Sequence, residues 1–338
     1  MRKFFIVPTL ISLIALGFVG VTLGIQAALV TLALIVIEMT FSFDNAIINA
    51  RILHTMSLFW RRMFMTLGIV IAVFGMRIVF PIVVVMLGAQ LSWQSVLDLA
   101  LHDPHQYAAH LHAAHPSIAS FGGIFLLMLA LDFFMDKGRD ARWLGRFESG
   151  LQKIGYVWMP ALLCGLTTVI IALLPINHHP GETLQAGLVG IILYLAIKGV
   201  TALFGRRQDS GSLDAKTGIA GLISFLYLEV LDASFSLDGV IGAFAITYNV
   251  VLIALGLGVG ALWVRSFTLY MVHHRTLHRY RYLEHGAHYT IGLLALFLLA
   301  SLFVSLPEAI PGIAGVAIIV LSIVASKRAA SADVETIY

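Results

Sequence analysis

The sequence predicts an all-α, polytopic membrane protein with about ten transmembrane helices and an inverted-topology repeat. Three observations predict this fold. Hydrophobic residues fill 59% of the 338 positions and charged residues only 12%, whereas a soluble domain carries about 25% charged residues. Apolar runs long enough to cross a bilayer recur along the chain, and one acidic motif occurs twice. A soluble enzyme is therefore almost excluded, and the single cysteine, Cys164, excludes an intramolecular disulfide and a cysteine-rich metal site.

Ten apolar runs have the length of a membrane span, about 17 to 25 residues. They lie at residues 4–24, 27–50, 63–88, 119–135, 157–176, 183–204, 217–247, 250–272, 287–304 and 310–326. The first run follows Arg2 and Lys3 and is longer than the usual core of a signal peptide, so we expect a retained helix, with cleavage as the alternative. We expect one membrane domain over residues 1–338, built from an extra first helix (4–24), repeat one (27–136), a connecting helix pair (157–204), repeat two (217–304) and a last helix (310–326).

Basic residues predict the orientation of the chain. If both termini are cytoplasmic, 18 of the 21 Lys and Arg residues lie in the inner segments 1–3, 51–62, 136–156, 205–216, 273–286 and the tail. The outer loops then hold none, and the other three bases, Arg77, Lys198 and Arg265, fall within spans. Because basic loops stay in the cytoplasm, this bias supports ten spans with cytoplasmic N and C termini. It also accounts for the net charge of +3, so no nucleic-acid partner is expected.

An acidic segment occurs in both the second and the seventh span. Residues 38–45 are EMTFSFDN and residues 232–239 are DASFSLDG, so each copy has two acids six positions apart around the same Phe-Ser pair. The following span carries an arginine in both cases, first Arg77 and then Arg265. Because the copies are five spans apart, they cross the membrane in opposite directions. Repeats of this kind place transporter substrate sites near the bilayer midplane.

The charges inside the spans do not balance. Three bases, Arg77, Lys198 and Arg265, stand against six acids, Glu38, Asp44, Asp132, Glu229, Asp232 and Asp238, which leaves three negative charges. A charged group at the bilayer centre costs at least about 2.5–3.5 kcal/mol, so a cation or protons must supply the difference. The structural alternative pairs Asp44 and Asp238 with the two arginines and still leaves acids over. Lys198, nearer a membrane end, is expected to snorkel.

Helical spacing sorts the polar side chains into faces. One stripe of the first copy holds Glu38, Ser42, Asn45 and Asn49, another face holds Thr40 and Asp44, and the second copy repeats the division with Asp232 and Ser236 against Ser234 and Asp238. Six residues turn an ideal helix by about 240°, so both acids of one copy reach one ion only if the helix is unwound. We therefore expect a break at residues 40–44, and Gly239 and Gly242 to ease the same distortion in the second copy.

The candidate ligands are carboxylates, amides and hydroxyls. This hard oxygen set suits Mg²⁺, Ca²⁺ or Mn²⁺, and no histidine lies centrally in a span. Met39 is a candidate selector for Mn²⁺, but simple packing is the favoured interpretation of this residue.

Residues 42–46 (SFDNA), preceded by Glu38, and the copy from Glu229 to Asp238 resemble the TerC family of bacterial integral membrane proteins. Residues 41–51, 121–136 and 227–247 are similar to its branch of unknown function. The family was named for an association with tellurium resistance and is grouped with LysE-type exporters. The resemblance implies export of divalent metal, chiefly manganese, across the bacterial inner (plasma) membrane. Carried onto matching positions, it implies an ion site formed by Glu38, Asp44, Asn45, Asp232 and Asp238.

We therefore expect an exporter of Mn²⁺ that works by alternating access, with Ca²⁺ and Mg²⁺ as alternative ions and protons as the candidate coupling ion. Neither a resident cofactor nor enzyme activity is expected; the partners are the metal ion and the lipid bilayer, and a homo-oligomer is left open. The supporting residues are Thr40, Ser42, Asn49, Ser234 and Ser236 as further ligands, Asp132 and Glu229 as proton relays, and Arg77 and Arg265 as gate or ion-pair residues. Two alternatives stay open: a membrane scaffold in a tellurium-resistance or envelope-stress system, and an intramembrane carboxylate-dependent enzyme.

Two further motifs have competing interpretations. The outer loop at residues 89–118 carries His102, Asp103, His105, His110, His112 and His115. A site that catches or releases metal is one interpretation, and a short external amphipathic helix is the favoured one. Gly256, Gly258 and Gly260 fall short of a dinucleotide motif because no strand precedes them, so close helix packing explains them better.

Overall fold

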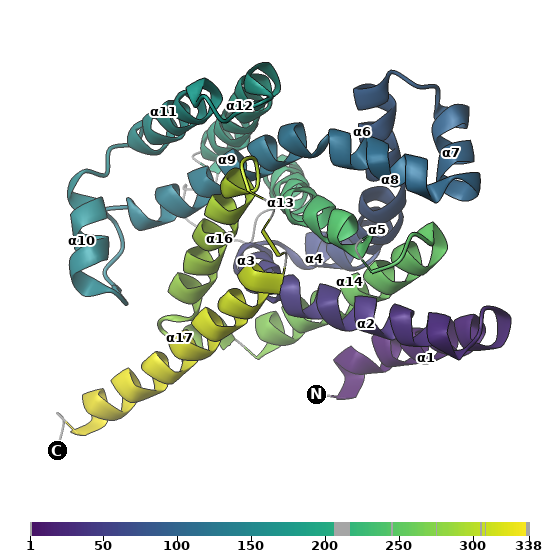
Figure 1. Ribbon diagram of the computed structural model, residues 1–338. Coiled ribbons are helices and arrows are strands. Elements are labelled where there is room, and N and C mark those ends of the chain that lie inside the picture. Colours follow the sequence, from purple (N-terminus) through teal and green to yellow (C-terminus); the bar gives the residue numbers. More distant parts are fainter. Residues whose placement is uncertain are drawn as a thin grey trace. The chain divides into compact units, whose positions relative to one another are not determined.

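The computed structural model describes residues 2–205, 217–244, 246–274, 276–304, 306–307 and 309–335. Within these residues the chain forms helices and no β-strand (Figure 1), so the prediction of an all-α polytopic protein is confirmed. The side chains of residues 2–3, 41, 201, 204–205, 235–238, 278, 309 and 331–335 lie outside the described part.

The described residues form helices along the whole chain. In chain order they are α1 (Arg2–Thr22), α2 (Ile25–Phe41), α3 (Phe43–His54), α4 (Leu58–Met65), α5 (Leu67–Val70), the π-helix η1 (Ile71–Val79), α6 (Phe80–Ala89), α7 (Trp93–His102), α8 (Pro104–Ala113), α9 (His115–Phe134), α10 (Gly145–Lys153), α11 (Met159–Leu173), α12 (Pro180–Gly205), α13 (Gly218–Phe244), α14 (Val250–His273), α15 (Thr276–Arg279), α16 (Leu283–Ala300) and α17 (Ala309–Glu335).

The described part contains eight helical spans that are long and apolar enough to cross a membrane, and up to nine if the bent pair α2 and α3 forms one span. Each coincides with one of the predicted apolar runs. The remaining predicted run, 157–176, contains α11, which is only 15 residues long. At 1.5 Å per residue this helix measures about 22 Å, short of a hydrocarbon core of about 30 Å. The tenth predicted span is therefore shorter than expected.

The first acidic copy is broken, as predicted. Helix α2 ends at Phe41 and α3 begins at Phe43, and the two axes differ by 51°. Ser42 between them has φ −99° and ψ 15°. The break is narrower than the expected unwinding over residues 40–44, because the Ser42 N–H still donates to the Glu38 carbonyl and the Ser42 carbonyl still accepts from the Ala46 N–H.

The second acidic copy is not broken. Helix α13 runs without interruption from Gly218 to Phe244, so the distortion expected at Gly239 and Gly242 is wrong. Gly239 has a packing role instead: a Cβ at this position would lie 3.3 Å from Glu38 Oε2. The missing side chain lets the carboxylate of the first copy approach the backbone of the second.

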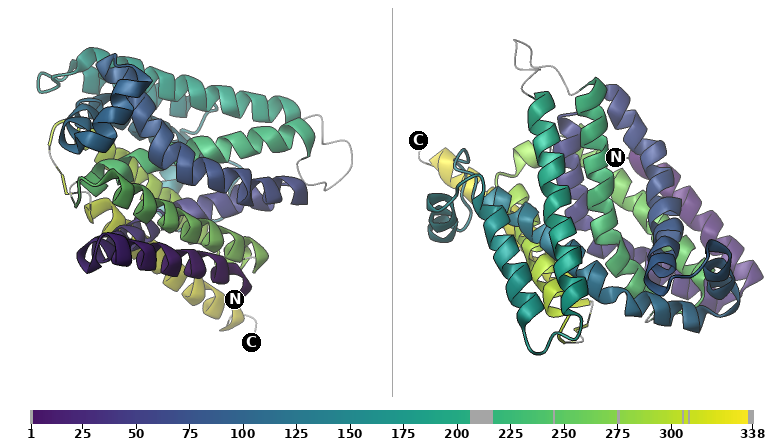
Figure 2. Two further views of the ribbon diagram at one scale, coloured as in Figure 1. Left: turned by 90° about the vertical axis from the view of Figure 1, so that its right-hand side faces the viewer. Right: turned by 90° about the horizontal axis from the view of Figure 1, so that it is seen from above.

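The chain divides into two compact units, residues 1–115 with 201–270 and residues 116–200 with 271–338. Each unit thus combines segments from both predicted repeats. In the first unit α1 lies along α2, and in the second unit α16 and α17 lie side by side (Figures 1 and 2). Helix α1 is also tied to α14, because Trp263 Nε1 donates to Ser12 Oγ at 3.0 Å and the Trp263 ring stacks on Phe5.

Three glycines bring α14 close to its neighbours in the first unit. A Cβ at Gly256 would lie 2.5 Å from Leu34 Cβ, and a Cβ at Gly260 would lie 2.5 Å from Glu38 Cβ, so both glycines pack directly on α2. A Cβ at Gly258 would lie 3.0 Å from Val73 of η1. The prediction of close helix packing at these glycines is confirmed.

The histidine-rich outer loop forms two short helices, α7 and α8, rather than the single helix expected. Helix α8 buries Tyr107, Ala108 and Leu111, and burial raises the pKa of the Tyr107 phenol. His105 stacks on Tyr248 with 4.0 Å between ring centroids. No group of three metal-ligating side chains forms among the described residues, so the helical interpretation of this loop is the one the structure supports.

Candidate functional site

The first buried ion pair joins Glu38 of α2 to Arg77 of η1. Glu38 is 4% exposed and Arg77 7% exposed. Ser42 Oγ donates to Glu38 Oε1 at 3.2 Å, and Arg77 Nη1 donates to the Ala72 carbonyl at 2.8 Å. Arg77 belongs to the π-helix η1, in which the helical turn is locally wider than in an α-helix. Such turns are frequent at functional sites. The pair neutralises the first acid of the first copy.

The second buried ion cluster centres on Arg265 of α14, which is 2% exposed. Its Nη2 donates to Asp232 Oδ2 at 2.8 Å and to Glu229 Oε1 at 3.2 Å. Its Nη1 donates to the Phe64 carbonyl at 2.9 Å, and the guanidinium lies 4.0 Å from the Phe64 ring centroid. The first acid of each copy therefore pairs with the arginine of the span that follows it. The alternative pairing through the second acids is wrong for Asp44, which makes no ion pair in the described part, and the side chain of Asp238 lies outside that part.

Two asparagines connect the copies. Asn45 Nδ2 of α3 donates to Asp232 Oδ1 of α13 at 2.5 Å, and Asn49 Nδ2 reaches the same oxygen at 3.5 Å. Both asparagines are buried, at 3% and 1% exposure. Their Oδ1 atoms have no donor among the described residues. The junction of α3 and α13 therefore holds two buried amide oxygens that are free to accept, next to a carboxylate.

Within the described part of α2, α3 and α13, Asp44 is a buried acid without a counter-charge. It is 4% exposed, its Oδ1 accepts the Asn45 N–H at 2.9 Å, and it makes no ion pair within the described part. It lies in the first turn of α3, where the helix dipole favours negative charge. Two arginines thus face four described acids in this region, Glu38, Asp44, Glu229 and Asp232, and two negative charges are left when all are ionised.

The family model described as Protein of unknown function (DUF475) matches residues 43–332. The chain belongs to this DUF475 family. The match begins just after Glu38 and the α2–α3 break, and it includes Asp44, Asn45, the three acids on α13 and both arginines. Neither the search of curated proteins nor the search of solved structures found a match.

Other predicted residues of this DUF475 protein have local or separate roles. Thr40 Oγ1 donates to the Val36 carbonyl at 2.7 Å and Ser234 Oγ to the Val230 carbonyl at 2.9 Å, so both hydroxyls are used within their own helices. Met39 packs against an apolar cluster that includes Ile35, which supports its packing interpretation. The side chains of Ser236 and Asp238 lie outside the described residues.

Asp132 belongs to the second compact unit. There it pairs with Lys198 and accepts the Tyr194 hydroxyl at 2.9 Å. Lys198, which is expected to snorkel toward a membrane end, therefore has a carboxylate partner on α9. Asp132 lies two residues before the end of α9, so it is near an end of this helix rather than its middle.

Within the described part of the DUF475 chain, the acids do not form a closed metal site. Among the described residues no three His, Cys, Asp or Glu side chains lie close enough together to hold a metal. The physical reason is the pairing of Glu38 with Arg77 and of Asp232 with Arg265. Each guanidinium occupies the direction in which its carboxylate would otherwise meet a cation.

The sequence alone did not identify Gly68 and the Phe64 carbonyl as contacts of Arg265. A Cβ at Gly68 of α5 would lie 2.5 Å from Arg265 Nη1 and 2.8 Å from Glu229 Oε1. Gly68 precedes Arg77 by nine residues, as Gly256 precedes Arg265, so the repeat spacing was the available signal. The span after each copy packs against acids of the other copy: α5 against Glu229 and α14 against Glu38.

Proposed function

We propose that this DUF475 protein exports divalent metal cations, with Mn²⁺ the first candidate, from the cytoplasm across the bacterial inner membrane by alternating access. Both termini lie in the cytoplasm in this proposal, as the positive-inside bias predicts. The observation that carries the proposal is Asp44, a buried carboxylate with no counter-charge in the described part, in the first turn of the helix that also carries two amide oxygens without donors. A buried negative charge and free oxygen acceptors are what a hard dication requires.

The arginines have a defined place in this mechanism. With the metal absent, Arg77 and Arg265 neutralise Glu38 and Asp232. An entering dication competes with the guanidinium for the same carboxylate, and Asn45 and Asn49 stay next to Asp232 to complete an oxygen shell. In each transport cycle the metal ion then replaces an arginine guanidinium as the partner of the carboxylate. Protons on the acids are the proposed coupling ions. The TerC resemblance, which names manganese, favours Mn²⁺ over Ca²⁺ and Mg²⁺.

The two rival functions make different demands on the acids. An intramembrane aspartyl enzyme needs two carboxylates that share a proton, whereas Glu229 and Asp232 both hydrogen-bond to one guanidinium. A scaffold needs no ionisable centre and predicts that removal of the Asp44 charge leaves the cellular phenotype unchanged. The buried, uncompensated carboxylate therefore favours a transporter.

Transport by purified protein in liposomes tests the proposal. Vesicles that contain a manganese-sensitive dye report Mn²⁺ flux, and parallel vesicles report Ca²⁺ and Mg²⁺. We expect Asp44→Asn, which keeps the shape and removes the charge, to lower Mn²⁺ flux by about tenfold or more. Asp98→Asn is the matched control, since Asp98 lies on α7 with its side chain 75% exposed. Equal flux in Asp44→Asn and wild type, or no Mn²⁺ flux in wild type, would overturn the proposal.

A further inference from the structure

We infer that residues 137–158, with α10 at their centre, form a docking surface for the headgroups of anionic phospholipids. We call these residues the α10 segment. The segment connects α9, which ends at Phe134, to α11, which begins at Met159. The inference stands apart from the proposed metal transport, because it rests only on residues of the second compact unit.

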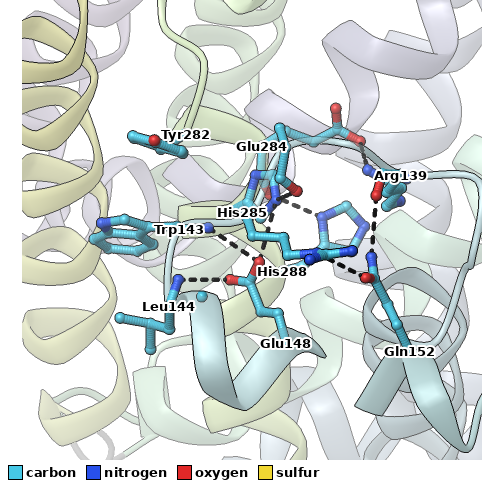
Figure 3. A network of polar contacts seen from close by, with 12 residues as sticks. Arg139, Trp143, Leu144, Glu148, Gln152, Tyr282, Glu284, His285 and His288 are labelled. Atoms are coloured by element: carbon cyan, nitrogen blue, oxygen red, sulfur yellow. Dashed lines mark hydrogen bonds and ion pairs between the residues drawn. The ribbon is translucent and has the colours of Figure 1, made fainter. Parts of the chain in front are cut away.

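The inner face of α10 is fixed by buried hydrogen bonds (Figure 3). Glu148 is 2% exposed, and its two oxygens accept the backbone N–H groups of Trp143 and Leu144, each at 3.0 Å. Glu148 Oε1 also accepts the Tyr289 hydroxyl at 2.8 Å. Gln152, one turn further, donates to the Arg139 carbonyl at 3.2 Å. The orientation of the helix is thereby set, and its opposite face is left outward.

The outward face carries a basic stripe beside an apolar one. Arg146 and Lys153 are seven residues apart, as are Phe147 and Ile154, so each pair lies on one side of the helix. Both basic residues are exposed, and Phe147 and Ile154 are 57% and 48% exposed. A short helix with adjacent basic and apolar stripes is typical of elements that lie in the plane of a membrane interface.

The chain that follows α10 extends the apolar stripe toward the membrane. Tyr156, Val157 and Trp158 are 56%, 87% and 58% exposed and lead directly into the apolar helix α11. Tyr and Trp are enriched where a chain crosses from water into lipid. This continuity favours a bilayer over a soluble acidic protein as the partner.

The charge of the α10 segment complements an anionic leaflet. Arg139 is paired with Glu284 at 3.1 Å, and Glu148 is buried. The exposed charged residues that remain are Lys137, Arg142, Arg146 and Lys153 against Asp140, four positive charges against one negative. Each basic residue close to an anionic leaflet strengthens binding by about fivefold, so Arg146 and Lys153 together contribute about 25-fold.

A nitroxide probe on α10 tests the docking. Cys164→Ala removes the single native cysteine, and Gly150→Cys places the probe between Arg146 and Lys153, where an added Cβ meets nothing within 4 Å. Electron paramagnetic resonance then measures collisions of the probe with a water-soluble nickel chelate. The vesicles contain phosphatidylcholine alone or phosphatidylcholine with an equal part of phosphatidylglycerol.

We expect the probe to be protected from the chelate only in the vesicles with phosphatidylglycerol, and about 1 M salt to remove the protection, because the Debye length falls to about 3 Å. Arg146→Glu with Lys153→Glu should abolish the protection. Arg279→Glu with Arg281→Glu, which makes the same charge change at other exposed positions, should keep it. Equal nickel access in both kinds of vesicle, or equal loss in both double variants, would overturn the inference. The lipid and salt comparisons decide it on the labelled parent protein even if a charge variant fails to fold.

Discussion

Replacement of Gly260 by alanine tests the packing that holds Glu38. Gly260 lies on α14 against α2, and a Cβ added there would lie 2.5 Å from Glu38 Cβ and 2.6 Å from Glu38 Cγ. Non-bonded carbons prefer a separation of about 3.5–4.0 Å, so the shortfall is about 1 Å. The methyl group fits only if the two helices separate or Glu38 moves away from Arg77. Overpacking of this kind costs about 1–3 kcal/mol, and the better helix propensity of alanine returns at most about 1 kcal/mol.

The expected net loss of stability is therefore about 2 kcal/mol when the weakened Glu38–Arg77 pair is included. Thermal unfolding of the protein in detergent, followed by circular dichroism, measures it. The matched control is Gly199→Ala on α12, where an added Cβ meets nothing within 4 Å. Because only helix propensity changes there, this variant should be as stable as wild type or slightly more so. If Gly260→Ala and Gly199→Ala unfold at the same temperature, the packing argument is refuted.

Two further substitutions test the buried polar groups. Arg265→Met leaves Glu229 and Asp232 without their guanidinium and should cost about 3–5 kcal/mol in a denaturant titration; adding Asp232→Asn should recover part of this loss, and no recovery would contradict the pairing. Glu148→Ala removes the acceptor of two backbone N–H groups and of the Tyr289 hydroxyl and should cost about 1–3 kcal/mol. Limited proteolysis should then cut residues 136–156 faster than in wild type, and an unchanged cleavage rate would argue against the role of Glu148.

Much of the fold could be predicted because membrane spans are a local property of the chain. In lipid each backbone group must be satisfied within its own helix, so an apolar run of sufficient length determines a span without reference to distant residues. The repeat of acid, Phe-Ser and arginine predicted that the arginines are available to acids of the two copies, but not which acid each arginine meets: the structure pairs Glu38 and Asp232 with them. The break near Ser42 was predicted from the six-residue spacing of its two acids, but this spacing does not determine a break, because Asp232 and Asp238 have the same spacing in the uninterrupted helix α13.

The contacts of the candidate site were decided by the tertiary structure. Asn45 and Asp232 are 187 residues apart in the chain, and no local pattern states that an amide of α3 meets a carboxylate of α13. No local pattern predicts the ion pair of Lys198 with Asp132 on another helix either. Nor does the sequence of α13 show that this helix stays continuous, since it resembles the broken first copy.

The sequence by itself therefore determined the helical class, the apolar spans and the residues that are costly to bury, since these follow from composition and period. Only the tertiary structure decided which of those residues neutralise one another and which, like Asp44, stay without a counter-charge in the described part. The reason is physical: the energy of a buried charge depends on the atoms within a few ångströms of it, and those atoms come from distant segments.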